Sequence, residues 1–241
     1  MNARMPYFRQ VVHSDTGCLV HLIGCPSHGV MGIVDPLRSH VDEYLRIVDE
    51  EGYQLTHIID THIHGDHISG SRALAERTGA KILMHESTEA NFPFQGLKDG
   101  EIFQIGNPKI KAMYTPGHTP ESITLNFDKR LLLTGDTLFV GDVGRIDLYK
   151  GATIDAIYDS VQRLLTLDDH LAVFPAHYGN SMCGKGLSPV TSTTLGVERR
   201  MNYALKAKSK EEFLKLVTED MPPPPDDYVR IKRINFGLED P

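Results

Sequence analysis

The stretch Thr61-His62-Ile63-His64-Gly65-Asp66-His67 places three histidines and one aspartate within six residues. It follows the apolar run from Leu55 to Ile59, which predicts a buried strand that delivers His62 at its carboxyl end. Alternation along an extended chain puts His62 and His64 on one side, and Gly65 allows the turn that brings Asp66 and His67 round. Imidazole and carboxylate groups are natural ligands of zinc and iron, so the stretch predicts a metal site.

Three more ligand-type residues come after predicted strands. They lie in Pro116-Gly117-His118-Thr119, in Thr134-Gly135-Asp136-Thr137 and in Pro175-Ala176-His177. A single histidine after a strand is more often a polar residue with ordinary hydrogen-bond partners than a metal ligand. Three such residues in this order, each beside Gly or Pro, instead indicate one metal constellation. Its members are His62, His64, Asp66, His67, His118, Asp136 and His177.

The spacing of apolar residues around these motifs predicts an α/β fold. Strands are expected at residues 8–12, 19–23, 32–34, 55–59, 81–84, 110–114, 123–127, 130–134 and 171–174. Helices are expected at 41–48 after a Ser39 cap, at 69–78 before Gly79, and at 154–165, 194–206 and 209–217, the last with a Ser209/Glu212 capping box. Two strand-rich halves with helices outside predict two sheets packed face to face. We expect one domain, residues 1–241, with a C-terminal helical extension from about 194 to 241.

Composition excludes several classes of protein. The 241 residues are 40% hydrophobic and carry a net charge of −7, which is ordinary for a folded domain and a poor match for nucleic-acid binding. No apolar run reaches membrane-spanning length, and Met1 to Val12 has no signal-peptide core, so we expect no membrane contact. Three cysteines cannot all pair within the chain, which favours reduced thiols and a cytoplasmic location.

The pattern H-x-H-x-D-H, followed by His118, Asp136 and His177, resembles the metallo-β-lactamase superfamily. The resemblance covers the chain from about the first strand to His177. It implies a four-layer αββα sandwich with the metal site at one edge, which agrees with the two predicted sheets.

Two metal arrangements are possible with these ligands. In the hydrolase arrangement, that of glutathione thioesterases (glyoxalase II) or lactonases, two Zn²⁺ ions generate a hydroxide. One zinc is then held by His62, His64 and His118, the second by Asp66, His67 and His177, and Asp136 bridges them. In the other arrangement, two histidines and one carboxylate hold a single iron and leave three positions open for substrate and dioxygen.

The residues after Asp136 favour the iron arrangement. Glyoxalase II has a similar Gly-Arg turn, usually with an aromatic pair after the arginine, whereas here Arg145 is followed by Ile146 and Asp147. Arg-x-Asp at this place resembles the persulfide dioxygenases (sulfur dioxygenases). That resemblance implies one Fe(II) per chain on His62, His118 and Asp136, with His64, Asp66, His67 and His177 around them as hydrogen-bonding groups. It implies oxidation of a thiol persulfide, such as glutathione persulfide, by O2 to sulfite and thiol.

The resemblance is greatest to the branch often fused to rhodanese domains. It is carried by Gly141-Asp142-Val143-Gly144-Arg145, by Cys183-Gly184-Lys185-Gly186, by 193–202 and by Arg230 to Asn235. This sequence shows no rhodanese domain after them, so it stays open whether a separate sulfurtransferase (rhodanese) acts as a partner. The family also implies a homodimer. Glutathione, coenzyme A and other small thiols all stay open as the carrier.

Three further residues are candidates for the catalytic site. Arg145 could pair with Asp147 to brace the loop, which we favour two to one over substrate contact. Tyr178 is equally well interpreted as a ligand contact or as a packed aromatic residue. Cys183 follows His177 and could relay sulfur, although a buried free thiol is the commoner role. Cys18 and Cys25 lie in early strands and are expected in the core.

A third class of function is a thiol-binding or scaffold protein that kept the fold without catalysis. The intact set of seven ligand-type residues argues against it. Metal content separates the two enzyme classes, because one predicts about one iron per chain and the other about two zinc ions.

Overall fold

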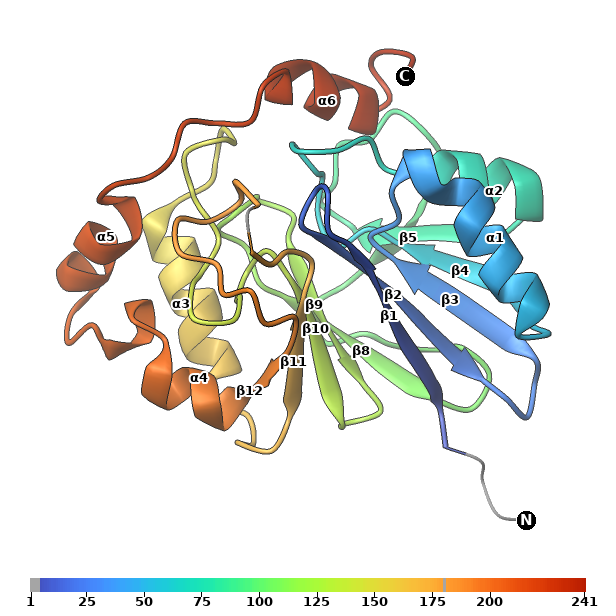
Figure 1. Cartoon of the computed structure of the whole chain (residues 1–241), viewed down its shortest axis with the longest axis horizontal. Coiled ribbons are helices and arrows are strands. Elements are labelled where there is room, and N and C mark those ends of the chain that lie inside the picture. Colours follow the sequence, from blue (N-terminus) through green and yellow to red (C-terminus); the bar gives the residue numbers. More distant parts are fainter. Residues whose placement is uncertain (1–4, 180) are drawn as a thin grey trace.

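Two six-stranded sheets face each other in the computed structural model, which describes residues 5–179 and 181–241 (Figure 1). The first sheet has the order β1-β2-β3-β4-β5-β6 and comes from the first half of the chain. The second has the order β12-β11-β10-β9-β8-β7 and comes from the second half. Strands that follow one another in sequence tend to pair, so the strands of each half of the chain form a separate sheet.

The first sheet combines antiparallel and parallel pairs. β1, β2 and β3 pair antiparallel, and β3, β4, β5 and β6 pair parallel. Its strands are β1 (Tyr7–His13), β2 (Cys18–Cys25), β3 (Val30–Val34), β4 (Gln54–Ile59), β5 (Lys81–His85) and β6 (Gln95–Leu97). β2 is buried along its whole length, which fits its central place and its apolar sequence.

The second sheet is antiparallel except where β10 pairs with β11. Its strands are β7 (Ile102–Gln104), β8 (Lys109–Tyr114), β9 (Ile123–Phe127), β10 (Leu131–Gly135), β11 (Ala172–Pro175) and β12 (Thr193–Thr194). Leu131, Leu133 and Phe127 face the first sheet and share a core with Ile59 and Leu83.

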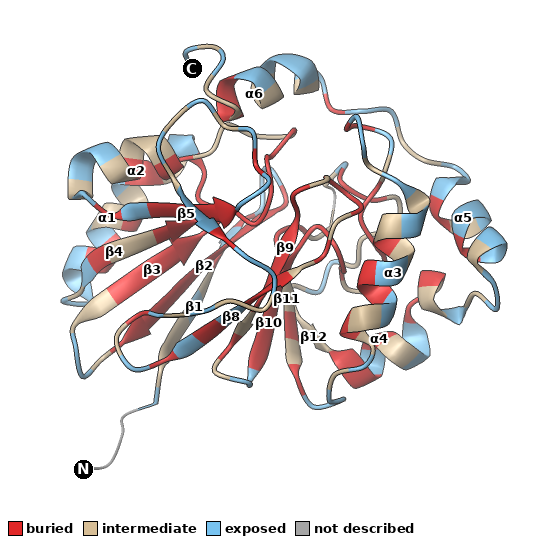
Figure 2. Ribbon diagram, turned by 180° about the vertical axis from the view of Figure 1, so that it is seen from behind, coloured by how far each residue is buried: buried red, intermediate tan, exposed pale blue. Residues whose placement is uncertain are grey.

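Helices cover the outer faces of both sheets and complete four layers (Figures 1 and 2). α1 (Val41–Glu50) and α2 (Ser71–Thr78) pack on the first sheet, and α3 (Ile154–Leu164) and α4 (Leu195–Met201) pack on the second. α5 (Lys210–Thr218) packs against α3 on the side away from the sheet, where Phe213 contacts Tyr158 (Figure 1). α6 (Tyr228–Asn235) lies across the edge where the strand ends meet. Burial is greatest in the two sheets and decreases toward the outer helix faces (Figure 2). The predicted α/β sandwich is therefore confirmed.

Several predicted boundaries need correction. Ser39 does not cap α1, because a 3-10 turn (Arg38–His40) precedes the helix and His40 occupies the cap position. The helix expected at 194–206 is broken after Met201, where the Asn202 side chain binds the Asp142 carbonyl and Glu198 and its backbone becomes extended. A short 3-10 turn (Ala204–Lys206) follows.

At the C-terminal end, one prediction holds in part and one element was missed. Ser209 caps α5 by accepting from the Glu212 amide. The carboxylate of Glu212 accepts from the Lys208 amide instead of closing the expected box on Ser209. α6 (Tyr228–Asn235) was not predicted; it packs through Asn235 at its end against the loop after β4.

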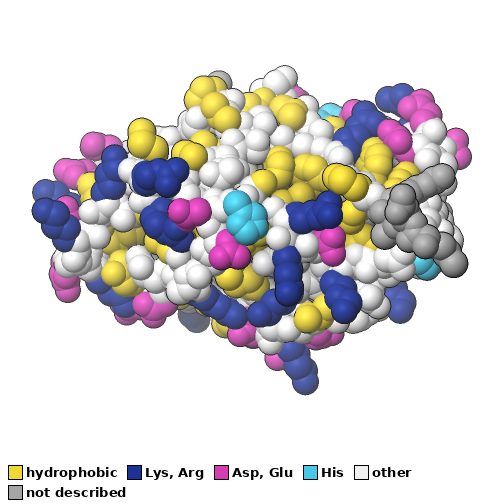
Figure 3. All heavy atoms as spheres, turned by 90° about the horizontal axis from the view of Figure 1, so that it is seen from below, with side chains coloured by type: hydrophobic (Ala, Val, Ile, Leu, Met, Phe, Trp, Pro, Cys, Tyr) yellow, Lys and Arg dark blue, Asp and Glu magenta, His cyan; other side chains and the backbone are white. Residues whose placement is uncertain are grey.

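Within the described residues, none of the helices has the length and apolar character needed to cross a membrane. Figure 3 shows the end of the molecule opposite α6, where Lys and Arg side chains alternate with Asp and Glu. A face with mixed charges lacks the continuous positive field that phosphate contacts require.

Candidate metal centre

Four strands end at the same edge of the sandwich, and each is followed by a ligand-type residue. His62 follows β4, His118 follows β8, Asp136 follows β10 and His177 follows β11. Gly135 has a φ of 52°, and a Cβ there would lie 2.6 Å from Thr61 Oγ1. Only glycine lets β10 approach the His62 loop this closely, so the two sheets meet at the site.

His62, His118 and Asp136 form the tightest group of ligand atoms. His62 Nε2 and His118 Nε2 lie 3.7 Å and 3.5 Å from Asp136 Oδ2. All three residues are buried, with at most 2% of their surface exposed. Three ligand-type atoms thus converge at one buried point from the ends of three strands.

Hydrogen bonds fix which nitrogen of each imidazole faces that point. The Arg145 carbonyl, 2.7 Å away, accepts from His118 Nδ1. Thr61 Oγ1 donates to Asp35, so at 2.9 Å it accepts from His62 Nδ1. Both Nε2 atoms therefore carry a lone pair toward Asp136. His62 Nε2 and Asp136 Oδ2 have no hydrogen-bond partner in the described parts of the chain, so the trio fits a cation.

The protonation of these residues suits metal binding. Burial, helped by His64, holds the pKa of His62 well below its usual value. Burial also lowers the pKa of His118, against the effect of Asp136. Burial alone raises the pKa of Asp136, but His177 and His62 reverse this and lower it below its usual range. At neutral pH the site therefore presents two neutral imidazoles and one carboxylate.

His64 lies next to the trio, with its ring centroid 4.2 Å from that of His62. Its Nε2 lies 3.3 Å from Asp35 Oδ1, and its ligand atoms group with those of Asp35 and Asp60. Asp35 is itself held by the backbone amide of Thr61 at 2.7 Å. The ligand atoms of His64 therefore group apart from those of the trio, while its Nδ1 is buried with no hydrogen-bond partner among the described residues.

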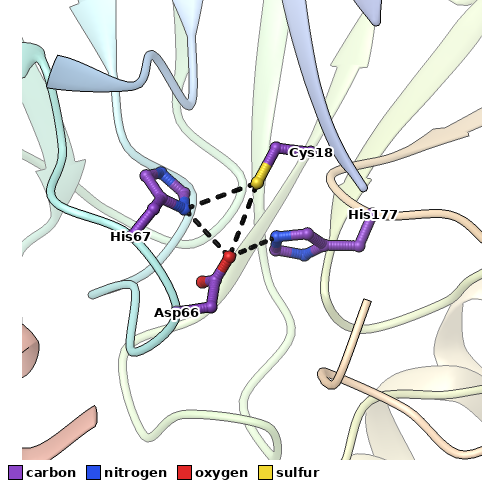
Figure 4. Close-up of side chains that lie close together, drawn as sticks. All are labelled: Cys18, Asp66, His67 and His177. Atoms are coloured by element: carbon purple, nitrogen blue, oxygen red, sulfur yellow. Dashed lines mark hydrogen bonds and ion pairs between the residues drawn. The ribbon is translucent and has the colours of Figure 1, made fainter. Parts of the chain in front are cut away.

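A second group of ligand atoms contains Cys18, Asp66, His67 and His177 (Figure 4). Asp66 Oδ2 lies 2.8 Å from His177 Nε2 and 3.0 Å from His67 Nδ1. Cys18 Sγ lies 3.5 Å from the same oxygen. Burial alone raises the pKa of the Cys18 thiol, but His67 and His177 bring it down to about 7 overall. Cys18 was expected in the core, and it is buried, but sequence spacing gave no sign that it reaches the site.

His177 connects the two groups. Its Nδ1 lies 2.7 Å from Asp136 Oδ1, while its Nε2 faces Asp66. Asp136 therefore has one oxygen in the trio and the other on His177.

Asn235 at the end of α6 holds the loop that carries the histidines. Its side-chain amide donates to the carbonyls of His64 at 2.9 Å and His67 at 2.8 Å, and its oxygen accepts from the Ser69 amide. Sequence analysis missed this role, because nothing in the spacing of Asn235 relates it to residues 64–69.

The sequence profile of the metallo-beta-lactamase superfamily matches residues 15–177. This chain belongs to the metallo-β-lactamase superfamily. The profile ends at His177, so it spans every strand end that contributes to the two groups.

Relatives in this superfamily differ in their names. The hydroxyacylglutathione hydrolase of Francisella tularensis subsp. novicida is 28% identical over 223 residues, which is 83% of this chain and 86% of the relative. The solved structure of ETHE1 from Myxococcus xanthus has a TM-score of 0.88 and 32% identity, with 96% of this chain and 99% of that chain covered. The solved structure of a metallo-beta-lactamase from Staphylococcus aureus subsp. aureus COL has a TM-score of 0.88 and 32% identity. The match covers 96% of this chain and 71% of that chain.

Within the superfamily site, Arg145 acts on the loop after Asp136. Its guanidinium pairs with Asp147 through two bonds of 2.7 Å and 2.8 Å. The remaining N–H groups donate to the carbonyls of Met182, Pro222 and Pro223. The side chain of Arg145 is fully buried, so these contacts favour the loop-bracing role. Substrate contact by Arg145 stays a prediction.

The other two candidates, Tyr178 and Cys183, both follow His177 in the chain. The ligand atoms of Cys183, Asp136 and His177 form a third group, and Cys183 is buried. Burial, with help from Asp66, raises the pKa of the Cys183 thiol, so at neutral pH it is protonated. Tyr178 is half-buried, and its backbone amide donates to the Gly17 carbonyl. Catalytic roles for Cys183 and Tyr178 stay predictions.

Proposed function

We propose that this chain is a persulfide dioxygenase with one Fe(II) held by His62, His118 and Asp136. The observation that carries the proposal is the placement of His64. A binuclear zinc hydrolase needs His64 on the first metal, yet the ligand atoms of His64 group with those of Asp35 and Asp60, apart from the group formed by the other three ligands. Two histidines and one carboxylate are the ligand set of non-haem iron oxygenases.

The sequence around the site supports the same choice. Asp147 pairs with Arg145 at the position where the hydrolase pattern has an aromatic pair. The Myxococcus protein, which is similar along nearly the whole chain, is ETHE1, a persulfide dioxygenase. These two observations come from different parts of the comparison, one from a loop and one from the entire fold.

The proposed substrate is a low-molecular-weight thiol persulfide such as glutathione persulfide. The balanced reaction is RSSH + O2 + H2O → RSH + SO3²⁻ + 2 H⁺, in which the terminal sulfur is oxidised and dioxygen reduced. Bound Fe(II) supplies open coordination positions where sulfur and dioxygen meet.

The protein side chains orient and shield this chemistry. Thr61 and the Arg145 carbonyl fix the two imidazole rings, and burial of the trio excludes bulk water. With a single carboxylate, Asp136, the ligand set leaves Fe(II) a net positive charge that attracts an anionic persulfide. The proposal further includes a cytoplasmic homodimer that works with a rhodanese-type sulfurtransferase.

One observation favours a second candidate, a binuclear zinc hydrolase of the glyoxalase II or lactonase type. Asp66, His67 and His177 lie together as a second metal would require, and the Francisella relative is named as a hydroxyacylglutathione hydrolase. In that case the chain would cleave a glutathione thioester.

The deciding experiment supplies glutathione persulfide to the iron-loaded protein and follows oxygen uptake, sulfite and metal content in one sample. We expect uptake with sulfite formed at about one iron per chain. Cleavage of a glutathione thioester without oxygen uptake, by protein holding zinc alone, would assign the hydrolase instead. His118→Ala is the control, and activity unchanged by it would mean that neither enzyme function uses this site.

A further inference from the structure

We propose that His13, His40 and Glu43 form a separate site for a divalent transition-metal ion, with zinc the best match, at the start of α1. The three residues come from the end of β1, from the 3-10 turn before α1 and from the first turn of α1. The proposed oxygenase function needs only the trio, and the hydrolase arrangement uses none of these three residues. The inference therefore goes beyond both.

Tyr44 holds the start of α1 against the end of β1. Its side chain is fully buried, and its hydroxyl lies 2.7 Å from His13 Nε2. His40 and Glu43 are three residues apart, so their side chains lie on one face of the starting helix. The fold thus brings a strand end and a helix start together with three ligand-type side chains between them.

The spacing of the ligand atoms is compatible with one ion. Each residue offers a ligand atom within 4.8 Å of those of the other two, and the imidazole centroids of His13 and His40 are 4.0 Å apart. Zinc bound to nitrogen and oxygen keeps neighbouring ligand atoms about 3.3–3.6 Å apart. His40 and Glu43 are only half-buried, so their side chains can close this difference of roughly 1–1.5 Å while the buried His13 stays in place.

Hydroxyl groups hold the second ring nitrogen of both histidines. Ser39 Oγ lies 2.9 Å from His40 Nδ1, and the Tyr44 hydroxyl lies on His13 Nε2. A ligating histidine donates its other ring N–H to such an acceptor, which fixes the ring and directs the free lone pair at the ion. The Tyr44 hydroxyl has a lone pair for this bond besides the one that faces the Leu37 amide. His40 Nε2 and His13 Nδ1 are thus the nitrogens available to the ion.

The buried imidazole binds an ion without first losing a proton. Burial, followed by the effect of His40, lowers the pKa of His13 below its usual value, against the effect of Glu43. At neutral pH His13 is therefore in the neutral form that ligates metals. Two imidazoles packed this closely cannot both take a proton at low cost, whereas one divalent ion satisfies both lone pairs and the Glu43 carboxylate.

The ligand chemistry selects the kind of ion. Two imidazoles and one carboxylate suit zinc and its neighbours, whereas magnesium and calcium prefer sets of oxygen ligands. Three protein ligands leave one tetrahedral position for water. Because His40 and Glu43 are partly exposed, this ion should exchange with solution more readily than one held by the buried trio. It ties the end of β1, whose His13 is paired with Cys18, to the start of α1.

The test counts the zinc ions bound by the whole chain in equilibrium dialysis against free zinc. His40→Ala and Glu43→Gln should each bind about one ion fewer than the parent chain, because each removes one of three ligands. The matched control is His170→Ala. His170 is an exposed histidine that belongs to no cluster of three ligand-type residues in the described parts of the chain, so this variant should bind as many ions as the parent. All three variants keep the strand-end ligands, so the comparison does not depend on how many ions that edge holds.

Nitrogen NMR of the histidine rings in the unmodified chain gives an independent readout. Zinc should shift the signals of His13 Nδ1 and His40 Nε2 and leave those of His170 in place. If a variant fails to fold, this measurement decides alone.

Three results overturn the proposal. These are equal zinc content in the parent, His40→Ala and Glu43→Gln, loss of the same ion in His170→Ala, and unshifted signals of His13 and His40 at saturating zinc. Neither readout depends on oxygen uptake, so failure here is distinct from failure of the dioxygenase proposal.

Discussion

The imidazole of His118 donates to the carbonyl oxygen of Arg145, with 2.7 Å between His118 Nδ1 and that oxygen. Arg145 in turn anchors its own loop, because its guanidinium is bonded to Asp147 and to three carbonyls. The orientation of the His118 ring therefore depends on the loop that the Arg145 side chain anchors. Residues 145–147, which distinguish the two enzyme families in sequence, act in the structure through the position of His118.

Replacing Arg145 by Lys should weaken metal binding while leaving all three ligands in place. Lysine cannot reproduce the paired bonds to Asp147 and reaches fewer of the carbonyls, so the loop and the His118 ring lose their fixed position. Loss of such a supporting contact typically costs 10- to 100-fold in metal affinity, so iron affinity should fall by about that factor. Competition with a chelator measures it.

The matched control is Arg163→Lys. Arg163 also pairs with an aspartate, Asp99, and donates to a carbonyl, but it lies on α3 and is partly exposed. Iron affinity in that variant should stay within about twofold of the parent. Equal losses in the two variants would show that Arg145 has no particular connection to the site.

Replacing Asn235 by Ala should destabilise the chain although Asn235 is not a ligand. The change leaves the carbonyls of His64 and His67 and the Ser69 amide without their partner in a buried place. Each such loss costs about 1–3 kcal/mol, so the free energy of unfolding should fall by about 2–4 kcal/mol in urea titrations. Arg233→Ala, on an exposed part of the same helix, should change it by less than about 0.5 kcal/mol.

The strands, and the place of the ligand-type residues at one sheet edge, could be predicted from sequence because both depend on local patterns. The choice of His62, His118 and Asp136 among the seven rested on the family resemblance. The run before His62 is apolar and the ligands sit at strand ends, so order along the chain already places them at one edge. Cys18 and Asn235 could not be predicted in their roles. Each reaches the site through contacts with residues more than a hundred positions away, on His177 and on the His64 loop, and no spacing rule encodes such contacts.

The predicted end of the helix at residues 194–206 was wrong for a related reason. Residues 194–206 have the apolar spacing of one helix, but Asn202 bonds across to Asp142 and ends α4 early. A tertiary hydrogen bond thus overrides local propensity. The same Asp142 accepts from the amides of Lys185 and Gly186, so the break in α4 belongs to the network that shapes the loop beyond Cys183.

The free energy of unfolding should decrease as the pH is lowered, because of His21 in β2. Burial lowers the pKa of His21 to about 4 in the folded chain, while the unfolded chain keeps the ordinary histidine pKa of 6.5. Between these values the unfolded chain binds the extra proton, so stability is present at higher pH and is lost as the pH falls. From about pH 7.5 to about pH 5 this residue should account for about 2 kcal/mol. His21→Leu should flatten the pH dependence of urea unfolding by that amount, and parallel curves for the two proteins would exclude His21 as the cause.

Thr61→Val should loosen one metal ligand without altering the shape of the strand end. Thr61 Oγ1 donates to Asp35 and accepts from His62 Nδ1, whereas the Thr61 amide keeps its own bond to Asp35. Without the hydroxyl, His62 loses the contact that orients its Nε2 toward Asp136, so iron affinity should drop about 10- to 100-fold. Thr56→Val within β4, the strand before Thr61, removes an equivalent 2.9 Å contact to His57 away from the site and should leave the affinity unchanged. If chelator competition instead gives the same affinity for Thr61→Val and Thr56→Val, then the ring of His62 is held by packing alone and the Asp35-Thr61-His62 chain has no part in metal binding.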